Sequence, residues 1–146
     1  MTLALQEISD RLEIQDLVFQ YSNLVDRKAF DELRDIFSED AFIDYSETGG
    51  SAGNLEETIA FLKESLGIFP NTQHLNGNVQ IVIDGDTASG RVMCFNPMVL
   101  NLGEVDHTFF LGLWYVDEYV RNAEGWRFSK RVQEASWNFN LPEVMQ

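Results

Sequence analysis

The two histidines are the side chains of this sequence best suited to moving protons, because imidazole titrates near neutral pH. His74 lies in the segment NTQHLNGN, just before an alternating apolar pattern begins, and His107 directly follows an aspartate. His74 is therefore either a solvated polar residue at the start of a strand or one half of a proton-transfer pair. A pair requires a carboxylate, which fixes the tautomer of the ring and raises its basicity.

Few residues of the chain suit metal or nucleophilic chemistry. The sequence has no H-x-H or HExxH pattern, no cysteine cluster and no glycine-rich phosphate loop, so we expect neither a metal nor a cofactor. His107 is expected at a sheet edge or a subunit contact. Cys94, the single cysteine, lies in the apolar segment RVMCFNPMV and is interpreted as a buried core thiol rather than a nucleophile.

The composition indicates one globular domain, which we assign to residues 1–146. Hydrophobic residues make up 45% of the 146, too many for a disordered chain. With 24 acidic and 10 basic residues, the net charge of −14 disfavours binding to nucleic acid or to an anionic membrane. The first residues do not resemble a signal peptide, and no apolar run reaches the length of a membrane span, so we expect a cytoplasmic protein.

Three helices are predicted in the first half of the chain. Apolar residues at steps of three and four describe a helix over residues 4–25 and a shorter one from about 28 to 37. A third helix is predicted over 54–66, where Asn54 and Glu57 resemble a capping box. Residues 40–45 are expected to form a short strand between the second and third helices.

The second half of the chain has the two-residue period of strands. A strand from about residue 73 reaches the turn sequence DGD, and further strands are predicted over 87–99, 105–120 and 126–138. This order of elements predicts an α+β domain in which helices cover one face of a curved antiparallel sheet and enclose a cavity.

The alternation of side chains raises a difficulty for His74. In a regular strand His74 would point away from the side that carries Val79 and Ile81. A β-bulge at Gly77 would bring both sets onto the same face, and we predict one there. By the same alternation, Arg131 is expected on the face opposite Trp126 and Phe128.

Three segments of the chain resemble the SnoaL-like branch of the nuclear-transport-factor-2-like superfamily, which includes scytalone dehydratase, bile-acid 7α-dehydratase and lindane dehydrochlorinase. They are YSNLVDRKAFDELRDIFSEDAFIDY (21–45), TQHLNGN (72–78) and DEYVRNAEGWRFSKR (117–131). The resemblance implies a cone-shaped fold around a pocket and a homo-oligomer, either a trimer or a dimer.

The resemblance also implies catalytic residues. Asp26 and His74 match an acid–base pair of these lyases, Tyr45 matches a tyrosine that polarises substrate through water, and Arg131 matches an active-site arginine. From position alone, Asp26 could equally be a solvated acid or a helix cap, Tyr45 a core aromatic, and Arg131 one partner of a salt bridge at the pocket rim.

Other pocket positions depart from the relatives. Met98 stands where scytalone dehydratase has a second histidine, and Leu113 and Tyr115 stand near its serine and asparagine. The pocket is therefore expected to be less polar than in these relatives. Its predicted substrate-binding residues are Tyr21, Phe95, Met98, Leu113, Tyr115 and Trp137.

These observations favour a cofactor-independent lyase, a dehydratase or dehydrohalogenase, that acts on a small apolar cyclic or aromatic molecule. His74, held by Asp26, would remove a proton from carbon. The same pair could serve an isomerase or a polyketide cyclase. A non-catalytic alternative is a ligand-binding or assembly module, such as the small subunit of a ring-hydroxylating oxygenase, which has the same fold without a converging acid and base.

Overall fold

The computed structural model describes residues 2–146 and has two α-helices, several short 3₁₀ helices and one sheet. Helix α1 covers Leu5–Asp26 and α2 covers Leu55–Ser65. The N-cap of α2 is as predicted, because the Asn54 side chain accepts a hydrogen bond from the backbone N–H of Glu57 at 2.9 Å. The 3₁₀ helices are η1 (Phe30–Asp35), where a longer helix was predicted, η2 (Ser46–Thr48) and η3 (Glu143–Met145).

Seven strands form one mixed sheet. They are β1 (Phe37–Asp44), β2 (Ala52–Asn54), β3 (Asn71–Thr72), β4 (Leu75–Asp84), β5 (Thr87–Asn101), β6 (Asp106–Asn122) and β7 (Gly125–Phe139). Their order is β2-β1-β7-β6-β5-β3, and β4 pairs with β5 beside β3. All pairings are antiparallel except β1 with β7, which are parallel. These two strands are far apart in the chain, so no hairpin requires them to run in opposite directions.

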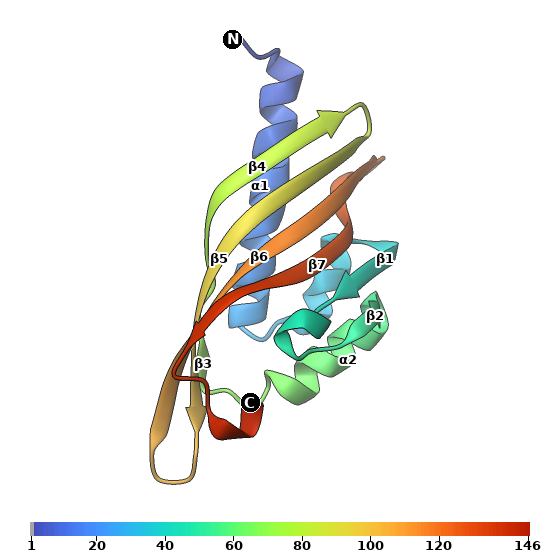
Figure 1. Ribbon diagram of the computed structural model, residues 1–146. Helices are drawn as coiled ribbons and strands as arrows, with labels where there is room; N and C mark the ends of the chain where they lie inside the picture. The colour runs from blue at the N-terminus through green and yellow to red at the C-terminus, as the bar shows by residue number, and fades with distance from the viewer. Residues whose placement is uncertain (1) are drawn as a thin grey trace.

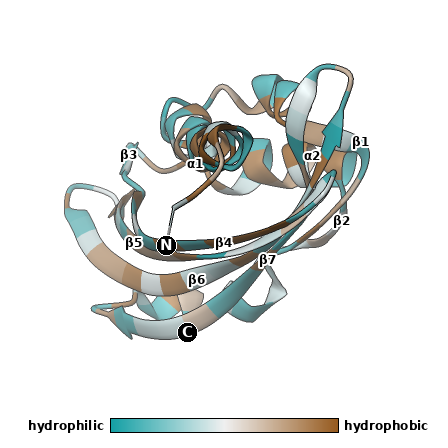
Figure 2. Cartoon of the chain, turned by 90° about the horizontal axis from the view of Figure 1, so that it is seen from above, coloured by the Kyte–Doolittle hydropathy of each residue, from teal (hydrophilic) through white to brown (hydrophobic). Residues whose placement is uncertain are grey.

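The sheet curves around α1, as the view from above shows (Figure 2). Helix α2, with β1 and β2, covers the end of the concave side, and the β5–β6 hairpin extends beyond the helices (Figure 1). The predicted α+β class, with helices over a curved sheet, is therefore confirmed. The prediction of a wholly antiparallel sheet is wrong, because β1 and β7 run parallel. The core lies between α1 and the concave face of the sheet.

An irregularity in β4 resolves the orientation of His74. The register with β5 shifts between Gly77 and Gln80, and Asn78 in this interval has φ of 46°. The predicted bulge is therefore present, one residue after Gly77. Before it, Asn76 faces the helix and donates from Nδ2 to Ser22 Oγ at 2.7 Å; after it, Ile81 is buried in the core.

A second irregularity places Arg131 in the core. Between the pairs Glu118–Lys130 and Tyr119–Phe128, β7 carries one extra residue, Ser129. Arg131 therefore lies on the same buried face as Phe128, and its predicted orientation opposite Trp126 and Phe128 is wrong. Its side chain is fully buried.

The Arg131 guanidinium forms a buried ion pair with Asp117. Nε donates to Oδ1 at 2.8 Å and Nη2 to Oδ2 at 3.0 Å, and the Tyr119 hydroxyl also donates to Oδ2 at 2.9 Å. Burial acts to lower the pKa of Arg131, but the Asp117 carboxylate outweighs it and raises that pKa, so the arginine stays charged. The rings packed on the guanidinium are those of Tyr115, Tyr21 and Phe128, with centroids 3.7, 4.3 and 4.5 Å from Cζ.

We expect Asp117→Asn to lower the free energy of unfolding by about 3–5 kcal/mol, because it leaves the buried Arg131 charge without a counter-charge. Denaturant unfolding followed by circular dichroism measures this loss. The matched control is Arg131→Met/Asp117→Asn, which removes both charges but keeps an acceptor for Tyr119. It should lose less stability than the single variant; an equal or greater loss would contradict an electrostatic cause.

Candidate active site

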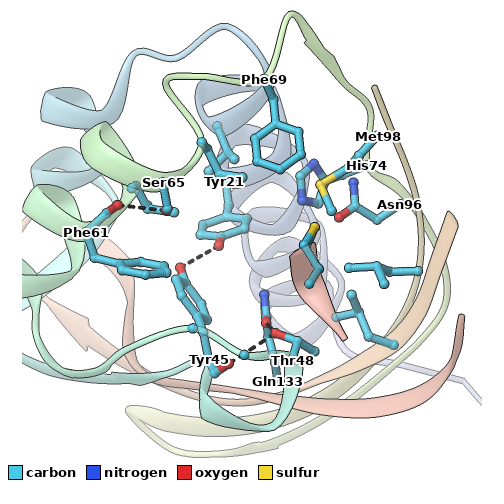
Figure 3. Close-up of a pocket in the computed structure, with 18 residues that line it drawn as sticks. Tyr21, Tyr45, Thr48, Phe61, Ser65, Phe69, His74, Asn96, Met98 and Gln133 are labelled. Atoms are coloured by element: carbon cyan, nitrogen blue, oxygen red, sulfur yellow. Dashed lines mark hydrogen bonds between the residues drawn. The ribbon is translucent and has the colours of Figure 1, made fainter. Parts of the chain in front are cut away.

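A cavity of about 210 Å³ lies between the concave face of the sheet, the end of α1, α2 and η2. Figure 3 shows the side chains that surround it. Its wall is mainly apolar, as is usual for a site that binds a small molecule. The apolar side chains of the wall are Val25, Phe61, Leu62, Leu66, Phe69, Met98, Leu111, Leu113 and Met145.

His74 lines this cavity and contacts Asp26, which is not itself one of the lining residues. Asp26 is the last residue of α1, and His74 lies between β3 and β4. The His74 Nδ1 and Asp26 Oδ1 are 2.6 Å apart, so the predicted contact is present. Two further donors hold the carboxylate at 2.9 Å: the backbone N–H of His74 to Oδ2 and the Thr72 hydroxyl to Oδ1.

This geometry sets the tautomer of His74. An ionised carboxylate accepts but does not donate, so Nδ1 carries the proton that is shared with Asp26. The basic nitrogen is then Nε2, and His74 is one of the residues that line the cavity. Only 5% of the His74 side chain is exposed, against 22% of the Asp26 side chain.

Tyr45 also lines the cavity, and its hydroxyl lies 2.5 Å from the Tyr21 hydroxyl (Figure 3). Burial raises the pKa of both phenols, while the nearby positive charge of Arg131 opposes the shift. Both hydroxyls are therefore protonated at neutral pH. One of the two protons forms the bond between them; where Tyr21 is the donor, the Tyr45 proton is left for a ligand.

Half of the predicted substrate-binding residues line the cavity: Tyr21, Met98 and Leu113. Tyr115 is fully buried against Arg131 instead. Phe95 and Trp137 stack on each other at 6.0 Å, and half of Trp137 is exposed. They are not among the cavity residues, so their predicted place in the pocket is wrong.

Strand geometry explains these corrections. Along β5 the buried side chains are Cys94, Asn96 and Met98, so Phe95 points to the opposite face. In β7 the register with β6 shifts between Leu113–Ala135 and Gly112–Trp137, which adds one more residue. Trp137 then lies directly over Gly112, where a Cβ would come within 2.0 Å of Trp137 Nε1.

Arg131 is not a cavity-lining residue either; it is fully buried, and its guanidinium packs on the ring of Tyr21, which does line the cavity. The prediction that it reaches the pocket directly, and the alternative of a rim salt bridge, are both wrong. The sequence could not reveal this, because the arginine changes face only through the extra residue Ser129 in β7.

Polar cavity residues that the sequence analysis did not identify are Thr48, Ser65, Asn96 and Gln133. Asn96 donates from Nδ2 to the backbone carbonyl of Gln73 at 2.7 Å, which holds the segment that carries His74. The sequence could have predicted that Asn96 faces the cavity, because it alternates with Cys94 and Met98 along the strand. For Thr48 the sequence indicated only a loop that contains glycines.

The two other candidate residues, Cys94 and His107, do not line the cavity. Cys94 is buried, as interpreted, and burial raises the pKa of its thiol to about 12. His107 Nε2 lies 2.7 Å from the backbone carbonyl of Asn140 and does not line the cavity. Within residues 2–146, no three His, Cys, Asp or Glu side chains are grouped as metal ligands, and none of the helices is long and apolar enough to span a membrane.

Residues 6–132 match the family model of the SnoaL-like domain. The chain belongs to the SnoaL-like family. A relative, the uncharacterized protein Rv2910c of Mycobacterium tuberculosis, is 47% identical over 131 residues, which are 90% of this chain and 88% of the relative.

Solved structures show the same SnoaL-like fold. The Kfla4162 protein of Kribbella flavida is 28% identical, with a TM-score of 0.84 over 92% of this chain and 95% of its own. The hexachlorocyclohexane dehydrochlorinase LinA-type3 of Novosphingobium barchaimii is 21% identical, with a TM-score of 0.80 over 95% and 94% of the two chains. At that identity the second likeness shows the fold alone.

We expect the tyrosines of the native protein to resist ionisation until the fold is lost at alkaline pH. All four are buried, and burial is the largest cause that raises the pKa of each. Their folded-state pKa values lie above the unfolded value of about 10. Their contribution to stability is therefore complete below a pH of about 10 and is lost as the pH rises through the folded values.

Phenolate absorbance and far-ultraviolet circular dichroism, recorded over the same alkaline titration, measure this effect. The two signals should change together. Phenolate absorbance that appears near pH 10, as in free tyrosine, while the circular dichroism stays native would contradict it.

Proposed function

We propose that this SnoaL-like protein is a cofactor-independent lyase that acts on a small, mostly apolar cyclic or aromatic molecule. The observation that carries the proposal is the 2.6 Å contact between Asp26 and His74 at the wall of an apolar cavity. A general base needs this combination of an oriented imidazole and an enclosed site for the substrate.

In the proposed reaction, His74 Nε2 takes a proton from a substrate carbon. The electron pair of that C–H bond forms a double bond to the adjacent carbon, and hydroxide or halide departs from that carbon with its own electron pair. The Asp26 carboxylate stabilises the imidazolium that forms. A leaving hydroxide takes the proton from the imidazolium and becomes water. When halide leaves instead, the imidazolium gives its proton to solvent water, so in both cases His74 returns to the neutral form.

The Tyr21–Tyr45 pair would stabilise the negative charge that develops on the substrate. Its free hydroxyl proton is held inside an apolar wall, where a hydrogen bond is stronger than in water. Arg131, which was expected in the active site, does not contact the substrate in this proposal, because its guanidinium packs on the Tyr21 ring and does not line the cavity.

The convergence of acid and base favours catalysis over a binding or assembly module, for which no such pair is needed. An isomerase or a polyketide cyclase would use the same proton abstraction, and the fate of the carbanion distinguishes them. The dehydrochlorinase named above shares the fold, and dehydrochlorination is an elimination of the proposed kind.

We expect His74→Gln to lower the rate constant for elimination by at least about 10²-fold, because the amide cannot accept the proton. Asp26→Asn should cost a comparable amount, since it no longer stabilises the imidazolium. The losses should be far from additive in the double variant, because both residues serve one proton transfer. The assay is a screen of hydroxylated and halogenated cyclic compounds, followed by kinetics on the best substrate.

The matched control is His107→Gln. It removes the second histidine of the chain, which does not line the cavity, and should keep the wild-type rate. Circular dichroism and melting temperature verify that each variant folds. A His74→Gln protein as active as wild type would end the proposed mechanism. If no compound reacts but apolar ligands raise the melting temperatures of wild type and His74→Gln equally, the protein is a binding module.

We expect Tyr45→Phe to lower kcat about 10-fold or more while it changes KM little, because the lost hydroxyl acts on charge that develops in the transition state. Steady-state kinetics on the same substrate measure the two parameters. A change confined to KM would instead assign Tyr45 to uniform substrate binding.

A further inference from the structure

The wall formed by η2 and β7 holds a polar pair, Thr48 and Gln133, that the proposed proton transfer does not use. Both residues line the cavity, and the Thr48 hydroxyl hydrogen-bonds to Gln133 Oε1 (Figure 3). His74 approaches the cavity from a different wall, beside Asn96 and Met98 (Figure 3). A ligand that fills the cavity therefore meets His74 on one side and Gln133 on another.

The hydrogen bonds around Thr48 determine which way the Gln133 amide points. The Thr48 Oγ1 lies 3.1 Å from the Tyr45 carbonyl oxygen, which could compete for its proton. That carbonyl, however, already accepts from the backbone N–H groups of Thr48 at 3.1 Å and Gly50 at 2.8 Å, which occupy its two lone pairs. The hydroxyl proton is thus best donated to Gln133 Oε1.

This assignment leaves the Gln133 Nε2 group turned toward the cavity, as it is drawn in Figure 3. Within residues 2–146, Nε2 makes no hydrogen bond to protein. An amide nitrogen carries two protons and no acceptor capacity, so it needs an acceptor from the ligand.

Glycines and backbone hydrogen bonds define the turn that carries Thr48. Gly49 has φ of 89°, a backbone conformation that favours glycine, and a Cβ on Gly50 would lie 2.6 Å from Tyr45 Cβ. The N–H groups of Thr48 and Gly50 both donate to the Tyr45 carbonyl, and the turn places Thr48 beside Gln133.

The charge of the cavity narrows the choice of acceptor. No lysine or arginine is among the described residues that line it, and the chain carries a net charge of −14. A carboxylate or phosphate on the ligand would have no counter-charge here and would be costly to desolvate. The acceptor must be neutral, and a carbonyl oxygen offers two lone pairs without a proton that would compete.

We propose that Gln133 is a specificity-determining residue that donates from Nε2 to a neutral acceptor oxygen, a ketone carbonyl in the first instance, on the ring of the substrate. The inference rests on the proposed function only in that it describes the substrate of the same cavity. It adds a requirement, because the substrate must carry a ring oxygen as well as the proton that His74 removes.

The test compares 1-indanone with indane, which share one bicyclic skeleton and differ in the carbonyl. Dissociation constants for both are measured by ligand-observed NMR on wild type, Gln133→Leu, Gln133→Met and His107→Gln. Wild type and His107→Gln should prefer the ketone. Gln133→Leu should reduce the ketone-to-hydrocarbon preference about three- to tenfold, the value of one hydrogen bond, and leave indane binding nearly unchanged.

A second arm tests the orientation of the amide. Thr48→Val keeps the shape of Thr48 but removes the hydroxyl, so the amide can turn over, and part of the ketone preference should be lost. Gln133→Met repeats the removal of the donor with an unbranched side chain, in case Gln133→Leu does not fold.

The proposal is overturned if wild type binds the two ligands equally or binds neither, or if the folded Gln133 variants keep the wild-type preference. The proposed lyase activity can fail separately. If no compound undergoes elimination but the ketone preference depends on Gln133, the proposed binding subsite is supported and the proposed lyase activity is not. If His74→Gln abolishes elimination but the Gln133 variants keep the ketone preference, the lyase activity is supported and the subsite is not.

Discussion

The buried ion pair between Asp117 and Arg131 is the interaction on which the interior of this protein depends. It lies at the centre of the sheet, where β6 and β7 pair, and the rings of α1 and both strands pack on its guanidinium. A charge at this depth is tolerated only with a close counter-charge and hydrogen bonds. The pair thereby fixes the position of Tyr21 and, through the contact between the two phenols, that of Tyr45 in the cavity wall.

The candidate site joins two parts of the chain that the core brings together. Asp26 closes the first helix, and His74 precedes the first long strand. The Thr72 hydroxyl and the His74 backbone N–H donate hydrogen bonds to the Asp26 carboxylate, in addition to its contact with the imidazole. The acid is thus oriented by the fold itself, which is how supporting groups keep a catalytic pair in a single geometry.

The cavity combines an apolar wall with few polar groups, and each of these has a definite direction. The base, the phenol pair and the Gln133 amide face the interior from different elements, while the charged residues of the core lie behind them. Such an arrangement favours a neutral ligand, because nothing in the wall compensates a ligand charge.

The local pattern of the sequence determined the order of the elements, the cap at Asn54 and the α+β class. These follow from interactions between near neighbours in the chain, as does the burial of Cys94 in an apolar run. The resemblance of residues 21–45 and 72–78 to known lyases identified Asp26 and His74 as partners, and the alternation around His74 predicted the bulge that lies near Asn78.

Tertiary structure alone decided which face the side chains of β7 take. The extra residue at Ser129 and the shift beside Trp137 reset the alternation there, and neither was predicted. A bulge is a mismatch between the lengths of two paired strands, so it exists only once both strands have met. For that reason Arg131 went to the core and Trp137 to the outer face, although neither could be placed from its own strand.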